Sequence, residues 1–242
     1  MKSIKGILGF IWKIYFFLIV LLTVLLLYPF LLFYLLNEKY FNTGHKIVRF
    51  QAKLILFLVG IWAKVDGTIP NDGRTYVVCS NHSSYLDILL LYALFPKYLI
   101  FLGKKELGDV PLFNIYFKKM NILVDRKNSK AAHLSITKAV SEMNKGRSVV
   151  IFPEGTIPDT APVMRTFKNG AFKVAFENKI PILPITFPRN YCLLEDKWTI
   201  DAKCGPGIAP VYFHNVIETN TKAYSDLITL RETTKEIIQS KL

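Results

Sequence analysis

The feature that most constrains this chain is an uncharged apolar run from Ile14 to Leu36, which reads IYFFLIVLLTVLLLYPFLLFYLL. A helix needs about 20 consecutive apolar residues to cross the hydrocarbon core of a bilayer, so this run is long enough to enter or cross one. It is too long for the apolar core of a secretory signal peptide, and no A-x-A cleavage site follows it. We therefore expect a helix that stays on the mature protein and associates with a membrane.

A second apolar stretch, Leu54–Ala63, reads LILFLVGIWA and is too short to span a bilayer. Its flanks are basic, which favours an interfacial helix whose cations reach the lipid headgroups. Basic residues also lie on both sides of the first run, so the charge difference that orients a simple span is absent. We expect the first helix to enter one leaflet, bend near Pro29 and return through the second stretch. Residues 1–66 would then form a two-helix membrane-associating segment that does not span.

The charge balance indicates an anionic partner. The chain carries 31 Lys and Arg against 18 Asp and Glu, which gives a net charge of +13. Hydrophobic residues make up 51% of the sequence, and this favours lipid over nucleic acid. We therefore expect a bilayer containing anionic lipid as partner, and no nucleic acid. The cysteines are odd in number and lack C-x-x-C spacing, which fits a reducing compartment. They are Cys79, Cys192 and Cys204.

After Gly67 the pattern changes to short β-branched runs that alternate with amphipathic stretches. This alternation is typical of an α/β fold with a mostly parallel sheet flanked by helices, so we assign residues 67–242 to one such domain. The clearest helix runs from Ser129 to Lys145, with Ser129 as its N-cap and Gly146 as its stop. The expected strands are Thr75–Ser80, Tyr98–Gly103, Ile122–Asp125, Ser148–Phe152 and Ile182–Phe187.

The stretch Asn81–Asp87, NHSSYLD, follows the first of these strands and leads into an apolar helix. Five residues turn a regular helix through a net of about 140°, so His82 and Asp87 cannot share one helical face. With His82 in the loop and Asp87 in the first turn, the carboxylate can accept the Nδ1 proton and leave Nε2 free as a general base. The alternative is a histidine that caps its own helix.

A second motif, FPEGT at Phe152–Thr156, comes directly after the apolar run SVVI. A strand that breaks into Pro-Glu-Gly-Thr places the carboxylate of Glu154 at the C-terminal edge of the sheet, where open α/β sheets bind ligands. The loop that carries His82 should end at the same edge. We therefore expect the two loops to converge on one site, unless Glu154 is only an exposed turn carboxylate.

Cations stand close to the ends of other expected elements. Lys104, Lys105 and Arg126 come just past two expected strands, and each could bind a phosphate, the arginine in bidentate fashion. Lys168 opens a further helix, where backbone N–H groups favour anions. A solvated surface charge is the alternative interpretation of each.

In this order the motifs resemble those of the glycerolipid acyltransferase family, in particular its bacterial 1-acylglycerol-3-phosphate acyltransferases. NHSSYLD resembles the family's NHxxxxD, and KKEL with a following Pro and ILVDR resemble its second block. FPEGT resembles the third block and IPILPI the fourth. The resemblance covers about residues 75 to 190, and FPEGT in register with NHxxxxD is highly specific.

The resemblance implies roles for these residues. His82 would be the general base and Asp87 its partner, while Lys104 and Arg126 would contact the acyl thioester or a phosphate. The loop that carries Glu154, after the expected strand Ser148–Phe152, would belong to the acceptor site. That loop consists of Glu154, Gly155 and Thr156.

The implied reaction is direct acyl transfer from acyl-CoA or acyl-carrier protein to the sn-2 hydroxyl of 1-acylglycerol 3-phosphate, which gives phosphatidic acid for phospholipid biosynthesis. Residues 67–242 would be the catalytic domain, on the cytoplasmic face of the inner membrane because the donors are cytosolic. Neither Ser83 nor Ser84 lies in a G-x-S-x-G elbow, so no acyl-enzyme is expected. His and Cys show no ligand spacing, so neither a metal nor another cofactor is expected.

The sequence departs from the family pattern at two points. Ile157 and Pro158 follow FPEGT where the family commonly has Arg or Ser, so Arg165 or Lys168 could supply the missing phosphate contact instead. Asn114 stands where the second block usually carries Gly.

Two alternative functions stay open. One is acylation of another lyso-lipid, such as an amino-acid lipid or glycerol 3-phosphate itself, and the other is a non-catalytic scaffold that binds anionic membranes.

Overall fold

Seven strands form one sheet in the computed structural model, which describes residues 4–125, 128–219 and 226–242. Their spatial order is β1-β7-β6-β2-β5-β3-β4, and neighbouring strands are parallel except for the antiparallel pair β6 and β7. The expected α/β fold with a mostly parallel sheet is confirmed. The strands are β1 (Ile61–Asp66), β2 (Val77–Ser80), β3 (Leu99–Lys104), β4 (Ile122–Val124), β5 (Ser148–Ile151), β6 (Ile182–Thr186) and β7 (Gly207–Phe213).

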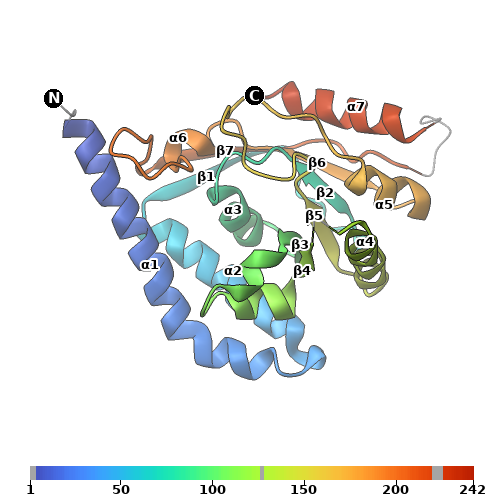
Figure 1. Cartoon of the computed structure of the whole chain (residues 1–242), viewed down its shortest axis with the longest axis horizontal. Helices are drawn as coiled ribbons and strands as arrows, with labels where there is room; N and C mark the ends of the chain where they lie inside the picture. Colours follow the sequence, from blue (N-terminus) through green and yellow to red (C-terminus); the bar gives the residue numbers. More distant parts are fainter. Residues whose placement is uncertain (1–3, 126–127, 220–225) are drawn as a thin grey trace.

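Helices cover both faces of the sheet (Figure 1). On one face lie α1 (Ile4–Tyr34), α2 (Phe41–Leu58) and α3 (Leu86–Leu94). On the other lie α4 (Ser129–Asn144), α5 (Gly170–Asn178) and α7 (Leu227–Gln239). Because the sheet is covered on both sides, every residue of the central strands β2 and β6 is buried. The short helices are η1 (Glu38–Tyr40), η2 (Lys105–Asp109), the π-helical η3 (Tyr116–Met120) and α6 (Asn190–Leu193).

All five strands expected from the sequence are present, each within two residues of its expected ends. The N-cap of α4 is Asn128 rather than Ser129, because the Asn128 side chain accepts a hydrogen bond from Ala131 N. Two strands were not expected, and they pair with each other at the edge of the sheet: β1 and β7. β1 lies within residues 1–66, so the first of the two expected segments also contributes a strand to the sheet. The division into a membrane segment and a catalytic domain stays a prediction.

The expectation that Leu54–Ala63 forms a separate interfacial helix is wrong. Its first half completes α2, Gly60 turns the chain with a φ of 72°, and Ile61 begins β1. The stretch is apolar because both elements bury part of it, as Leu56 at 6% and Ile61 at 2% exposure show. α1 runs as one helix through Pro29, and the segment that returns from it is α2.

Buried polar contacts attach the N-terminal helix pair to the sheet domain. Lys13 in α1 is only 1% exposed, and its Nζ donates to the backbone oxygens of Glu195 at 2.6 Å and Lys197 at 2.5 Å. Trp12 Nε1 donates to Val59 O at 3.1 Å, at the C-terminal end of α2. A buried ammonium without partners is costly, so these contacts keep the first half of α1 on the domain.

His45 attaches α2 to the start of β3. Its Nε2 accepts a hydrogen bond from Leu99 N at 3.2 Å, and its ring stacks on Tyr98 with the centroids 4.8 Å apart. Burial lowers the pKa of His45 to about 4, and the nearby Arg49 cation adds to this effect. The imidazole is therefore neutral near pH 7, which this contact requires because a protonated Nε2 cannot accept.

We expect the free energy of unfolding to fall as the pH drops from about 6.5 to about 4. The pKa of His45 is about 4 in the folded protein and 6.5 in the unfolded one, so the unfolded chain binds the extra proton in this window. The loss reaches about 3 kcal/mol. Denaturant titrations in detergent at several pH values measure it. His45→Gln keeps an acceptor but cannot titrate, so its pH slope should be flatter; an unchanged slope would contradict the assignment.

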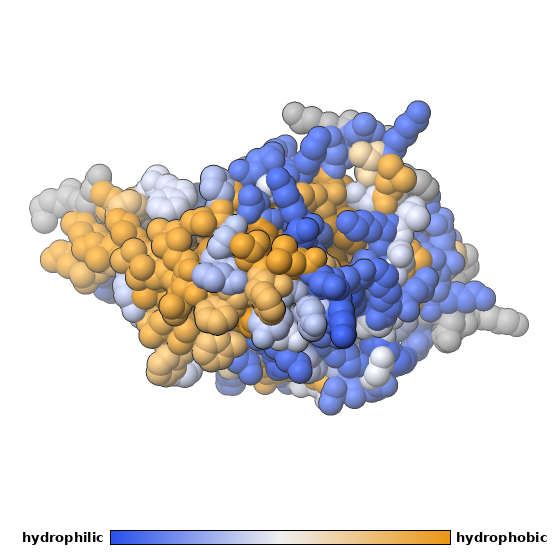
Figure 2. Space-filling view, turned by 90° about the horizontal axis from the view of Figure 1, so that it is seen from below, coloured by the Kyte–Doolittle hydropathy of each residue, from blue (hydrophilic) through white to orange (hydrophobic). Residues whose placement is uncertain are grey.

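α1 presents an apolar face to the outside. Figure 2, which views the molecule from below Figure 1, shows apolar side chains gathered on one side and hydrophilic ones over the rest. Within the described part of the chain, α1 is the one helix long and apolar enough to cross a membrane. A contiguous exposed apolar surface of this kind is consistent with membrane association. The exposed apolar side chains of α1 include Ile11, Leu18, Leu22, Leu26, Phe30 and Phe33.

Candidate active site

Three neighbouring strands, β5, β2 and β6, end at one edge of the sheet, and the loops that follow them carry the candidate site. Asn81, directly after β2, joins two of these loops. Its Nδ2 donates to Phe187 O at 2.9 Å, and its Oδ1 accepts from Phe187 N at 2.8 Å. The amide thus extends the pairing of β2 and β6 by one step and fixes the backbone next to His82.

His82 and Asp87 lie where helix geometry requires them. His82 is in the loop, and Asp87 is in the first turn of α3. His82 Nδ1 lies 2.9 Å from Asp87 Oδ2, the histidine side chain is 12% exposed and the aspartate is fully buried. Since an ionised carboxylate can only accept, Nδ1 carries the proton and Nε2 is left as an acceptor. The catalytic role of the pair stays a prediction.

Asp87 is a buried carboxylate with four donors around it. Besides His82, its Oδ2 accepts from Ser83 N at 2.8 Å and Ser84 N at 3.0 Å. Its Oδ1 accepts from Asn190 Nδ2 at 2.6 Å. Buried charge needs such partners, and because they are fixed they hold the carboxylate in one orientation. The carboxylate in turn fixes the imidazole ring.

Phe152 supports the imidazole from its flat side. The two rings are nearly parallel, with an interplanar angle of 14° and centroids 3.8 Å apart. Phe152 is the first residue of FPEGT, so this motif contributes to the histidine's position as well as to the loop that follows. Within the residues that the structure describes, His82 Nε2 has no protein partner, so it is available to a substrate hydroxyl.

Glu154 connects the loop after β2 with the loop after β5. It is 3% exposed; its Oε1 accepts from His82 N at 2.9 Å and its Oε2 accepts from Arg165 N at 2.8 Å. Burial raises the pKa of Glu154, and the two backbone hydrogen bonds oppose that rise. The carboxylate thus positions the backbone of the histidine. Its contact with an acceptor stays a prediction.

A cavity of about 480 Å³ lies beside Glu154. Gly155 makes room for a cation at its rim, because a Cβ at this position would lie 2.8 Å from Lys168 Nζ. The φ of Gly155, 80°, also favours glycine. The structure therefore brings together the four residues predicted around this loop, with Arg165 next to them. The lining consists of Glu154, Thr156, Met164, Arg165, Thr166 and Lys168.

Lys104, the last residue of β3, and Lys105, which follows it, do not line that cavity. Lys104 is 58% exposed and lies 3.4 Å from the carboxylate of Glu106, while Lys105 is 64% exposed and lies 3.2 Å from that of Asp125. Exposed ion pairs of this kind are weak, so either ammonium can turn toward a bound anion. Arg126 lies outside the described residues.

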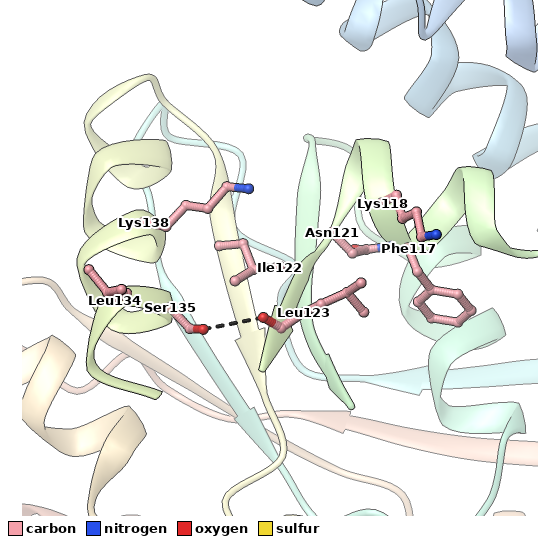
Figure 3. Close-up of a pocket in the computed structure, with 8 residues that line it drawn as sticks. All are labelled: Phe117, Lys118, Asn121, Ile122, Leu123, Leu134, Ser135 and Lys138. Atoms are coloured by element: carbon pink, nitrogen blue, oxygen red, sulfur yellow. Dashed lines mark hydrogen bonds between the residues drawn. The ribbon is translucent and has the colours of Figure 1, made fainter. Parts of the chain in front are cut away.

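A second cavity, of about 260 Å³, lies at the β4 edge of the sheet between η3 and α4 (Figure 3). Lys118 and Lys138 stand on its two sides, and Ser135 Oγ donates to Leu123 O at 3.2 Å. Its lining includes none of the predicted site residues. Among the residues that the structure describes, no group of His, Cys, Asp and Glu is arranged to hold a metal ion.

Sequence reasoning missed the hydrogen bond from Asn190 and the stacking of Phe152 on His82. Asn190 stands far along the chain from Asp87, so no spacing rule connects the two. One signal could have found it. Asn190 follows shortly after β6, so it lies at the same edge of the sheet as the histidine loop, and an amide is a suitable donor for a buried carboxylate.

Known proteins resemble this chain in both sequence and fold. Residues 63–188, slightly more than half of the chain, match the family model described as Acyltransferase. A 1-acyl-sn-glycerol-3-phosphate acyltransferase from Borreliella burgdorferi is 33% identical over 143 residues, which cover 58% of this chain and 56% of that protein. Its counterpart from Escherichia coli is 32% identical over 155 residues, covering 62% and 60%. The chain spans about half the length of several such relatives.

The whole fold also resembles a solved structure. The crystal structure of a 1-acyl-sn-glycerophosphate acyltransferase from Thermotoga maritima superposes with a TM-score of 0.79 at 22% identity. The match covers 99% of this chain and 95% of that one, so it includes the N-terminal helix pair as well as the sheet.

Proposed function

Because this chain belongs to the acyltransferase family, we propose that it transfers a fatty acyl chain from acyl-CoA or acyl-carrier protein to the sn-2 hydroxyl of 1-acylglycerol 3-phosphate, forming phosphatidic acid. The proposal rests chiefly on one observation: a buried Asp87 carboxylate lies 2.9 Å from His82 Nδ1, and Glu154, which accepts from His82 N, lines a cavity that also includes Arg165 and Lys168. The names of the relatives from Borreliella burgdorferi and Escherichia coli support the choice of acceptor.

In the proposed reaction, His82 acts as a general base. Its Nε2 takes the proton of the acceptor hydroxyl while the hydroxyl oxygen attacks the carbonyl carbon of the thioester. The resulting tetrahedral intermediate collapses, the carbon–sulfur bond breaks, and the imidazolium returns the proton to the leaving thiolate. The products are the acyl ester and the free thiol. Asp87 stabilises the transient imidazolium and keeps the ring oriented.

The hydroxyl of Ser84 supports direct transfer rather than a covalent acyl-enzyme. Ser84 Oγ donates to Leu194 O at 2.7 Å and accepts from Leu86 N at 3.1 Å, so it is engaged in the backbone structure. Ser83 Oγ is buried and has no hydrogen-bond partner among the described residues, so no base is placed to activate it. Lys104 and local backbone N–H groups are the candidates for stabilising the oxyanion, since positive charge near the carbonyl oxygen lowers the barrier.

The assay that tests this function uses purified protein, a radiolabelled acyl donor and a panel of lyso-lipids. We expect label to appear in phosphatidic acid when 1-acylglycerol 3-phosphate is the acceptor. Faster transfer to a phosphate-free lyso-lipid or to glycerol 3-phosphate would show that the proposed acceptor is wrong. A folded protein that binds anionic vesicles but transfers nothing to any acceptor would instead be a scaffold.

The acceptor phosphate is proposed to lie against the exposed cations of the cavity, Arg165 and Lys168. Lys168→Ala should raise the KM for the acceptor on the order of tenfold and leave the KM for the donor unchanged, because the charge contacts the phosphate. Steady-state kinetics with each substrate varied in turn measure both constants. Lys173→Ala is the matched control, since Lys173 pairs with Glu177 on the surface of α5. A rise in the donor KM alone would assign the cavity to the donor.

Arg126 remains a predicted phosphate or thioester contact and is tested in the same way. If it holds the acceptor, Arg126→Ala should raise the acceptor KM far more than the donor KM. An effect confined to the donor KM would assign it to the thioester side.

The helix pair is proposed to hold the catalytic domain on the cytoplasmic face of the inner membrane without crossing it. The first turns of α1 support this, because Cβ atoms at Gly6 and Gly9 would lie 2.6 Å from Ile200 O and 3.0 Å from Cys204 O. Such close contact supports a start of α1 that lies on the same side of the bilayer as the catalytic domain. Exposed Trp198 contacts Phe17 of α1, with the ring centroids 4.9 Å apart and the rings tilted by 32°, and an exposed tryptophan suits the headgroup region.

A cysteine introduced at Ser3 tests this orientation. Ser3 lies outside the described residues, directly before α1. In a variant whose three native cysteines are replaced, Ser3→Cys should be shielded from an impermeant thiol reagent in intact cells and react only after lysis. High salt alone should not extract the protein, since apolar contacts hold it. Labelling in intact cells would establish a true span.

A further inference from the structure

Asn190, the first residue of α6, contacts Asp87 on the side away from the histidine. Its Nδ2 donates to Asp87 Oδ1 at 2.6 Å, and both side chains are fully buried. The amide nitrogen must face the carboxylate, because a carboxylate offers no proton to the amide oxygen. Within the described residues, Asn190 supplies the donor that Oδ1 accepts, while Oδ2 accepts from His82 and two backbone N–H groups.

The other end of the same amide is unsatisfied. Asn190 Oδ1 is buried and has no hydrogen-bond partner in the part of the chain that the structure describes. Leaving a buried polar atom unpaired lowers stability, and an apolar side chain of similar volume would avoid that cost. The hydrogen bond to Asp87 is therefore the property that distinguishes asparagine from leucine at this position.

We propose that Asn190 is a positioning residue for the His82–Asp87 pair, an inference that rests on the proposed function. The Asn190 amide donates to Asp87 Oδ1, so Asp87 Oδ2 is left to accept from the histidine. These two contacts on opposite oxygens together set the plane of the carboxylate. A donor on Oδ1 also stabilises the ionised carboxylate, so the shared proton stays on His82 Nδ1. Nε2 then remains the atom that accepts the proton of the substrate hydroxyl.

The segment that carries Asn190 is held on two sides. Ser84 Oγ, from the histidine loop, donates to Leu194 O at the end of α6. From the other side, Lys13 of α1 donates to the next backbone oxygen, that of Glu195. Asn190 is thus placed between the catalytic loop and the apolar helix by contacts that do not involve the amide itself.

The first test replaces the donor with a side chain of similar size. Asn190→Leu should lower kcat on the order of 10- to 100-fold and leave both KM values unchanged, as expected when an outer partner of a reacting group is lost. Thr234→Val is the control, because Thr234 is buried and donates only within α7, to Leu230 O. It should lose stability but not kcat. Wild-type kcat in folded Asn190→Leu would overturn the proposal.

The second test keeps the shape of the Asn190 side chain and replaces its amide with a carboxyl group that can lose a proton. In Asn190→Asp two carboxyl groups share one proton, and the protonated one can donate as the amide did. As the pH rises that proton is lost, so the ratio of kcat in Asn190→Asp to wild-type kcat should fall with pH. If Asn190 only fills space, this ratio of kcat values should not change with pH. Circular dichroism checks that the samples are folded, and a constant or rising ratio in folded samples would refute the inference.

These outcomes separate the inference from the proposed function. If His82→Ala abolishes transfer while Asn190→Leu does not affect it, the function stands and the role of Asn190 fails. If folded His82→Ala is as active as the wild type, the proposed base itself is wrong.

Discussion

Replacing His82 with alanine is expected to lower kcat by about 10²- to 10⁴-fold, the range typical for loss of a general base. Asp87 and Phe152 fix the imidazole ring of His82. Within the described residues its Nε2 has no protein partner, so this atom can take a proton from the substrate. Without it, no side chain in the loop can take the proton from the acceptor hydroxyl. Steady-state turnover with saturating donor and acceptor measures the loss.

The fold should survive this change. The His82 backbone N–H, which donates to Glu154, is still present in His82→Ala, and the thermal unfolding midpoint should hardly change. His214→Ala is a suitable comparison, because it removes an imidazole that contacts Thr186 and lies outside the proposed machinery. It should keep wild-type kcat. If folded His82→Ala retained more than about a tenth of wild-type activity, the assignment of the base would be abandoned.

Asp87→Asn is expected to lower kcat by about 10²- to 10⁴-fold, and by less than His82→Ala, because the base itself is kept. An asparagine oxygen can still accept from Ser83 N and Ser84 N, while its amide nitrogen faces Asn190. Asn190 can turn its unpaired oxygen toward that nitrogen. The geometry is therefore preserved while the negative charge that stabilises the imidazolium is removed.

The Asp87→Asn variant separates the effect of losing the negative charge from the effect of disturbing the fold. Circular dichroism should show Asp87→Asn folded, and both KM values should stay near those of the wild type, since the substitution acts on the transition state. Asp87→Ala removes the acceptor as well and should be less stable, because it leaves buried N–H groups without partners. Near-normal turnover by Asp87→Asn would mean that the carboxylate charge plays no part in the reaction.

The relation between His82 and Asp87 could be predicted because it depends on local geometry. A spacing of five residues excludes one helical face, so one residue had to precede α3, and the structure has this arrangement. The convergence of the Glu154 loop on the same edge follows from the common direction of β2 and β5. Both expectations need only the direction and ends of neighbouring elements.

Contacts between distant segments could not be predicted in this way. β1 is hidden in an apolar stretch continuous with α2, and its partner β7 lies near the other end of the chain. Asn190 approaches Asp87 only because β6 is placed beside β2. Local periodicity carries no information about which strands become neighbours, so these residues become visible only when the sheet order is known.

Lys13 and its partner Glu195 are 182 residues apart along the chain. A ribosome that adds about 5–20 residues per second needs on the order of 10 to 40 s to supply this partner once Lys13 has been made. During that time α1 can pack against α2 through contacts such as Trp12–Val59, but the sheet domain is incomplete, whereas a bilayer offers its exposed apolar side chains a place to insert. We therefore expect the nascent chain to reach the membrane before its sheet can close, so that targeting precedes folding during synthesis.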